Sequence, residues 1–126
     1  MIQAAAILYA LATLAVVGFQ LALAAGAPWG EYAMGGRTTG RFPPPMRVAA
    51  VIQAVLLGVL ALVVLDKAGA ISLGWSAALP WLAWVPVVVS VLSAVMNAAT
   101  RSRVERRLWL PVAIVMLLSS IAVAAT

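Results

Sequence analysis

The chain has 126 residues, of which 66% are hydrophobic and 9% are charged, and its net charge is +5. A water-soluble domain carries about 25% charged residues, so this composition excludes a fully water-facing surface and predicts an integral membrane protein. The absence of Cys and His excludes disulfides, thiolate or imidazole metal ligands, and every catalytic arrangement built on Cys or His.

Four apolar segments with no charged residue in their interior follow one another along the chain. A helix of about 20 residues crosses the hydrocarbon core of a bilayer, which is about 30 Å thick. The expected spans are about 3–25, 47–66, 78–99 and 107–125. The 33 uncharged residues between Lys67 and Arg101 are too few for two spans and a turn, so residues 68–76 are expected to form a loop. The predicted fold class is therefore all-α, a single four-transmembrane-helix bundle that covers residues 1–126.

The first span has one feature of a cleaved signal peptide, because ALAAGA offers small residues at its end. However, no positive charge precedes the apolar run, and the run is longer than a signal peptide requires. We therefore expect this segment to remain as a transmembrane helix.

The first connection, residues 26–46, is rich in Gly and Pro, which favours irregular structure. Its GGRTTGR segment has some likeness to a phosphate-binding loop, but it lacks the Gly-Lys-Ser/Thr spacing and no strand precedes it. We therefore expect a structured loop at the membrane surface and no phosphate site.

Positive charges are distributed very unevenly over the connections. Of the eight Lys and Arg residues, only Lys67 lies in the second connection. The other seven lie in connections one and three: Arg37, Arg41, Arg47, Arg101, Arg103, Arg106 and Arg107. These two connections share one side of the membrane, so the positive-inside rule predicts that they are cytoplasmic and that both termini lie outside. Because Arg outnumbers Lys and Ala and Val dominate, as in GC-rich bacterial genomes, we expect a bacterial plasma membrane.

The charge and the aromatic residues both fit membrane anchoring. Basic residues that flank apolar runs are expected to face anionic lipid headgroups, so we expect no nucleic acid partner. Two groups of aromatic residues lie near the predicted ends of the spans, Trp75, Trp81 and Trp84 on the outer side and Trp29, Tyr32, Phe42 and Trp109 on the inner side. We expect two interfacial belts, and stacking on a ligand is the alternative.

Uncharged polar residues follow one face of two predicted helices. At 100° per residue, Tyr9, Thr13 and Gln20 fall within about 40° of one another. A similar stripe on the third span contains Pro86, Ser90, Ser93 and Asn97. Gln20, Gln53 and Asn97 are expected at a similar depth, so three amides are predicted to converge near the cytoplasmic side. Two explanations remain open, namely interhelical hydrogen bonds of about 0.6 kcal/mol each or a small polar cavity.

Six polar and charged residues form the candidate site on the predicted cytoplasmic side: Gln20, Glu31, Arg47, Gln53, Asn97 and Glu105. Arg47 either extends to lipid headgroups, as a lysine also would, or makes forked hydrogen bonds toward the protein. Glu105 either pairs with Arg101 one turn back or reaches Arg47 or Arg37 across this face. No catalytic, cofactor-binding or metal site is expected.

Three blocks of the sequence, GAPWGEYAMGG, PPPMR and MNAATRSRVERRLWLPVAIV, resemble a group of small, uncharacterised four-helix integral membrane proteins typical of actinobacteria. The resemblance runs along the whole chain and implies no specific activity. It implies a set of shared features on the cytoplasmic side, formed by Gly26, Pro28, Trp29, Gly30, Gly35, Gly36, Arg47, Asn97, Glu105 and Arg106.

The functional expectation is a structural or interaction component of the membrane and not an enzyme. The alternative is an oligomeric transporter or channel for a small solute or ion. No carboxylate lies deep in a span, although proton-coupled transport usually depends on one. Small multidrug transporters, which have a similar size, carry a Glu in the first helix that this chain lacks. The expected partners are membrane lipids, together with further copies of the chain or another membrane protein, and no cofactor.

Overall fold

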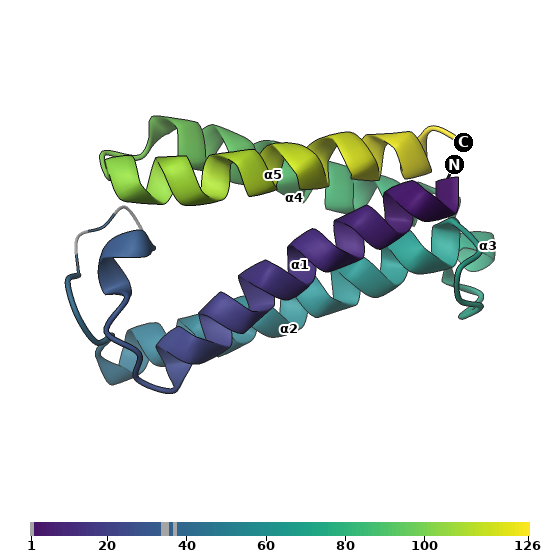
Figure 1. Cartoon of the computed structure of the whole chain (residues 1–126). Helices are drawn as coiled ribbons and strands as arrows, with labels where there is room; N and C mark the ends of the chain where they lie inside the picture. Colours follow the sequence, from purple (N-terminus) through teal and green to yellow (C-terminus); the bar gives the residue numbers. More distant parts are fainter. Residues whose placement is uncertain (1, 34–35, 37) are drawn as a thin grey trace.

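Four long helices dominate the computed structural model, which describes residues 2–33, 36 and 38–126 (Figure 1). These are α1 (Ile2–Ala24), α2 (Pro44–Lys67), α4 (Trp84–Ala99) and α5 (Arg103–Ala124). Three short elements complete the described chain: the 3-10 helix η1 (Gly30–Tyr32), helix α3 (Trp75–Ala78) and the 3-10 helix η3 (Pro80–Ala83), which leads directly into α4. No strand occurs in the described residues, and the all-α four-helix fold is confirmed.

Four helical segments, namely α1, α2, η3 together with α4, and α5, are each long and apolar enough to cross a membrane, with a mean hydropathy between 1.9 and 2.9. Large apolar side chains point outward along their length, for example Leu14 at 69% and Met96 at 71% exposure. Such an exterior is unfavourable in water and suits a hydrocarbon environment. The chain is therefore a multi-pass membrane protein.

Three helix boundaries differ from those predicted. The third span, predicted from residue 78, begins with the 3-10 helix η3 at Pro80 and becomes α4 at Trp84. Helix α2 begins at Pro44, where two prolines occupy the first helical positions, which require no N–H donor. Helix α5 begins at Arg103, because the Ser102 side chain accepts a hydrogen bond from the Glu105 N–H at 3.1 Å and caps the helix. The arginines between 103 and 107, which were predicted to lie in a loop, thus form the first turn of α5.

The four long helices form two pairs that diverge toward one end of the molecule. Helix α1 packs along α2, helix α4 packs along α5, and α1 also contacts α5. Figure 1 shows that the pairs approach each other near both chain termini and α3, and separate toward residues 25–43. We call these two ends the terminal end and the capped end, and we call the described residues of the connection there, 25–33, 36 and 38–43, the cap.

The described residues contain three separate apolar cores, the smallest of which joins Ala83 of η3 and Val87 of α4 to Ala124 of α5. The other two reflect the divergence of the helix pairs. The first joins α1, α2 and α5 through residues that include Tyr9, Val64 and Met116. The second lies at the capped end, where Phe42 of the cap packs with Leu23 of α1 and other residues of the α1–α2 pair. The cap therefore has a core of its own, which fixes it against this pair.

Candidate functional site at the capped end

The cap is a folded unit because close backbone contacts hold its two halves together. The Gly30 N–H donates to the Gly40 carbonyl at 2.9 Å. A Cβ on Gly30 would collide with the carbonyl oxygen of Thr38 and would lie 2.8 Å from that of Gly40, so only glycine permits this approach. The ring of Phe42, which is 1% exposed, fills the space beneath.

Two hydrogen bonds connect the cap to α5 across the open end of the bundle. The Trp109 indole N–H donates to the Tyr32 carbonyl at 3.0 Å, and the Ser102 hydroxyl donates to the Glu31 carbonyl at 3.2 Å. Gly36 also lies close to α5, since a Cβ there would be 2.9 Å from the Ser102 Cβ. The cap therefore bridges the two helix pairs where they separate.

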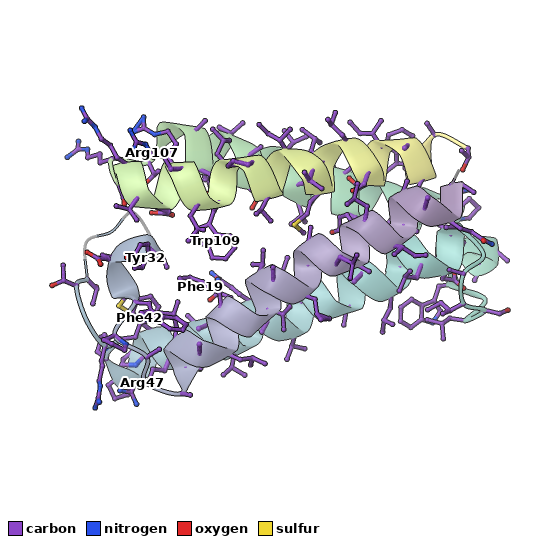
Figure 2. All side chains as sticks on the ribbon, viewed as in Figure 1. Phe19, Tyr32, Phe42, Arg47, Arg107 and Trp109 are labelled. Atoms are coloured by element: carbon purple, nitrogen blue, oxygen red, sulfur yellow. The ribbon has the colours of Figure 1, made fainter. Side chains whose placement is uncertain are left out.

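Aromatic rings fill part of the space between the diverging pairs. Phe19 stacks on Trp29, with ring centroids 6.2 Å apart and ring planes 5° apart, and its centroid lies 4.7 Å from that of Trp109. Figure 2 shows Phe19, Tyr32 and Trp109 in this region, between α1 and α5. Phe19, Trp29, Tyr32 and Leu108 line an open hollow of about 290 Å³.

This aromatic cluster differs from the lipid-anchoring belt expected on the inner side. Trp29 and Trp109 both contact Phe19, although Trp29 is still 44% exposed. Sequence analysis did not single out Phe19, because one apolar residue in an apolar helix carries no distinguishing signal. The one local feature that points to a role for Phe19 is its position directly before Gln20, near the end of α1.

Arg47 is directed toward the protein backbone. Its Nε–H donates to the Phe42 carbonyl at 2.8 Å, and the side chain is half-buried. Its guanidinium also lies beside Gly26, where a Cβ would be 3.4 Å from Nη2. Figure 2 shows Arg47 at the base of α2, on the opposite side of the open end from Arg107. Arg47 therefore binds the end of the cap that leads into α2 and lies beside the end that follows α1.

Glu105 takes part in a network that shapes the turn between α4 and α5. The Thr100 hydroxyl donates to Glu105 Oε2 at 3.0 Å, and the Ser102 N–H donates to the Thr100 hydroxyl oxygen at 3.3 Å. The side chain of Glu31 is exposed, and its backbone carbonyl makes the contact with α5. Gly35, one of the residues that the resemblance to small actinobacterial membrane proteins implied, lies outside the described residues.

The three candidate amides do not meet in the structure. Gln20 is half-buried and its Oε1 has no hydrogen-bond partner in the described part of the chain, whereas the Asn97 side chain donates to the Ser93 carbonyl of its own helix at 2.7 Å. Gln53 is exposed. Ala50 and Ala54 are the buried residues of α2 at this end, and Gln53 is adjacent to Ala54 in the sequence. Gln53 is therefore outside the packed face of α2.

The polar stripes themselves face the interior, as the sequence predicted. Tyr9, Thr13 and Ser90 are at most 3% exposed, and Ser93 and Asn97 are half-buried. This burial agrees with the cost of leaving polar groups in hydrocarbon without a partner.

Asp66 organises the terminal end, and sequence analysis did not assign it a role. Its Oδ1 accepts hydrogen bonds from the N–H groups of Leu73 at 2.7 Å and Gly74 at 3.2 Å. Its Oδ2 accepts from Ser76, from the N–H at 2.9 Å and from the hydroxyl at 2.8 Å. This role could have been predicted from an acidic residue at the end of a span that is followed by a Gly-Trp-Ser turn.

The capped end combines polar groups with a cluster of aromatic rings. In residues 2–33, 36 and 38–126, no three His, Cys, Asp or Glu side chains are grouped as a metal site would require. The resemblance to small actinobacterial membrane proteins stays a prediction. Comparison with known proteins found no matching family model, no matching curated protein and no matching solved structure.

Proposed function

We propose that this protein is a non-enzymatic component of a bacterial plasma membrane, with a structural or interaction role, and that the cap is its contact surface. The observation that supports this proposal is that the described residues of the cap form a folded unit fixed to both helix pairs. Helix–helix connections in bundles typically need about 2–8 residues. This connection is longer and has its own apolar core, which supports a role beyond joining two helices.

The proposed orientation places the cap in the cytoplasm. Seven of the eight Lys and Arg residues belong to the two connections at the capped end and the adjoining helix turns, and Lys67 is at the other end. Positive residues in short connections remain on the cytoplasmic side during insertion. Both termini and α3 would then lie outside the cell.

The positions of the carboxylates support a non-enzymatic role. Asp66 uses both oxygens to accept hydrogen bonds from the turn that follows α2. Glu105 accepts one from Thr100 in the turn between α4 and α5, and Glu31 is exposed with its carboxylate at the surface. A general acid or base needs a carboxyl group in a site that binds a substrate. Asp66 and Glu105 instead take part in turns, and Glu31 lies at an exposed position.

Site-specific photocrosslinking in living cells tests the contact surface. A photoreactive residue replaces Thr39 or Arg41, which are exposed in the cap, and Ser72, which is exposed at the terminal end, serves as the matched control. We expect a discrete crosslinked protein or lipid from both cap positions and none from Ser72. Equal products from both ends, or none from the cap, would remove the cap as the contact surface.

The alternative role as an oligomeric transporter or channel has one supporting observation. Within the described part of the chain, four buried side-chain oxygens of α1 and α4 have no hydrogen-bond partner, those of Tyr9, Thr13, Gln20 and Ser90. Apolar side chains fill the centre of one copy, so a continuous path requires several copies. Mass measurement in mild detergent and solute flux into liposomes test this role. A monomer without flux would argue against it, whereas flux from an oligomer would displace the structural role proposed above.

A further inference from the structure

Three hydroxyl groups come together inside the bundle, between α1 and α4. The residues Tyr9, Thr13 and Ser90 are 0%, 3% and 2% exposed. Tyr9 and Thr13 are one turn apart on the same face of α1, and Ser90 of α4 is buried close to the Tyr9 hydroxyl. However, none of the three oxygens has a hydrogen-bond partner in the part of the chain that the structure describes. We call these three groups the hydroxyl triad.

The surroundings of the triad make unsatisfied hydroxyls costly. Tyr9 belongs to the apolar core that contains Val64 and Met116, and the outside of the bundle is lined by exposed aliphatic side chains. A hydroxyl in such surroundings loses the hydrogen bonds that water would provide. Buried polar groups in native proteins almost always have a partner, from the protein or from an ordered water.

We propose that the hydroxyl triad binds one water molecule, which makes a hydrogen bond to each of the three groups and joins α1 to α4. Buried waters typically make about three hydrogen bonds to otherwise unsatisfied polar groups, which equals the number of hydroxyls at this site. This proposal is independent of the role assigned to the cap.

A neutral ligand fits the site better than an ion. The segments Ile2–Ala24 and Trp84–Ala99 contain no Asp, Glu, Lys or Arg. The charged residues of α2 and α5 are confined to the ends of those helices. An ion in this apolar interior would therefore lack an opposite charge, and the cost of removing it from water would not be offset.

The water also gives the two helix pairs a direct polar connection. Tyr9 and Thr13 belong to the α1–α2 pair, and Ser90 belongs to the α4–α5 pair. A single water can adjust its position as the pairs shift, so it maintains hydrogen bonding over a range of separations. This matters because the pairs diverge from the terminal end toward the capped end (Figure 1).

The sign of the stability change in single variants tests whether the triad is satisfied. Ser90→Ala and Thr13→Val each remove one hydroxyl, and we expect both to lower the melting temperature in detergent, because the water and the remaining hydroxyls lose a partner. The triple variant Tyr9→Phe/Thr13→Val/Ser90→Ala removes all three together and is expected to recover much of that loss. If the site is empty, each single variant removes an unsatisfied group and raises the melting temperature, which would overturn the proposal.

Direct bonds between the hydroxyls would give the same stability pattern, so a second measurement must detect the water. Tyr9 and Tyr32 are the two tyrosines of the chain, so tyrosine labelled with ¹³C at Cζ gives two assignable signals in bilayers. In solid-state NMR with magnetisation transferred from water, we expect the Tyr9 signal to build up rapidly despite 0% exposure. In Thr13→Val/Ser90→Ala this transfer should slow several-fold while that to Tyr32 is unchanged. Equally slow transfer to Tyr9 in both proteins would show a dry site and refute the proposal.

Discussion

Ser102 is the residue whose loss should most clearly weaken the connection between the cap and α5. Its oxygen accepts a hydrogen bond from the Glu105 N–H at 3.1 Å and so caps α5, and its hydroxyl proton is donated to the Glu31 carbonyl at 3.2 Å. Ser102→Ala removes both bonds at once. No described backbone group has to move for this substitution, so the loss of the two bonds should dominate the change in stability.

The expected magnitude is the sum of a helix cap and a surface hydrogen bond. Replacing a capping Ser by Ala costs about 1 kcal/mol. The bond to the Glu31 carbonyl is exposed to solvent, so it should contribute at the lower end of the usual range, about 0.5 kcal/mol. We therefore expect Ser102→Ala to lower the free energy of unfolding by about 1.5 kcal/mol.

The assay is unfolding in detergent followed by tryptophan fluorescence, because Trp29 and Trp109 lie in or against the cap. Ser102→Gly separates the two contributions, since glycine at a helix N-cap costs only a few tenths of a kcal/mol while the bond to the cap is lost. Ser72→Ala, at an exposed position at the terminal end, is the control and should have little effect. If Ser102→Ala behaves like Ser72→Ala, the cap is not held to α5 in the way described.

Three further substitutions test other parts of the structure. Arg47→Lys should lower the melting temperature much more than Arg41→Lys, because lysine has no Nε–H to donate to the cap backbone; similar small effects would favour simple contact with lipid headgroups. Gly30→Ala should destabilise the cap by about 1–3 kcal/mol, because the added Cβ collides with backbone carbonyls. Gly58→Ala is the control, since its added Cβ meets open space, and it should be neutral or slightly stabilising. The reverse order of these two effects would contradict the described packing. Asp66→Asn leaves one neutral amide oxygen for four donors and replaces the other oxygen with an NH2 donor, so amide hydrogen exchange after α2 should accelerate. Unchanged exchange would show that this carboxylate does not order the turn.

The fold was predictable because the membrane imposes a simple rule on the sequence. Charged residues separate four apolar runs of the required length, and an apolar run of that length in hydrocarbon must be helical. The inward direction of Tyr9, Thr13 and Ser90 was predictable for a related reason, since the helical period places them on common faces. The start of α5 was missed because Arg-rich segments occur in both loops and first turns, and the Ser102 cap is a weak local signal.

The details of the capped end depend on tertiary geometry that helical periodicity does not contain. The period of a helix shows that Gln53 lies near a packing face, but it does not show that the helix pairs separate there. Gln53 lies outside the packed face of α2 and is exposed, and the separation provides space for the cluster of Phe19, Trp29 and Trp109. The role of Asp66 depends similarly on a turn that returns to the helix end, which no repeat in the sequence specifies.

The orientation of the capped end is the central claim of this account, because a cytoplasmic contact surface requires it. The chain contains no Cys, so single cysteines at Arg41 in the cap and at Ser72 beyond α2 give unambiguous labelling in intact cells with a membrane-impermeant maleimide. Both positions are exposed, so lysed cells should label both and provide the control. The account predicts that Ser72→Cys is labelled in intact cells and Arg41→Cys is protected. Labelling of Arg41→Cys with protection of Ser72→Cys would place the cap outside the cell and contradict the proposed function.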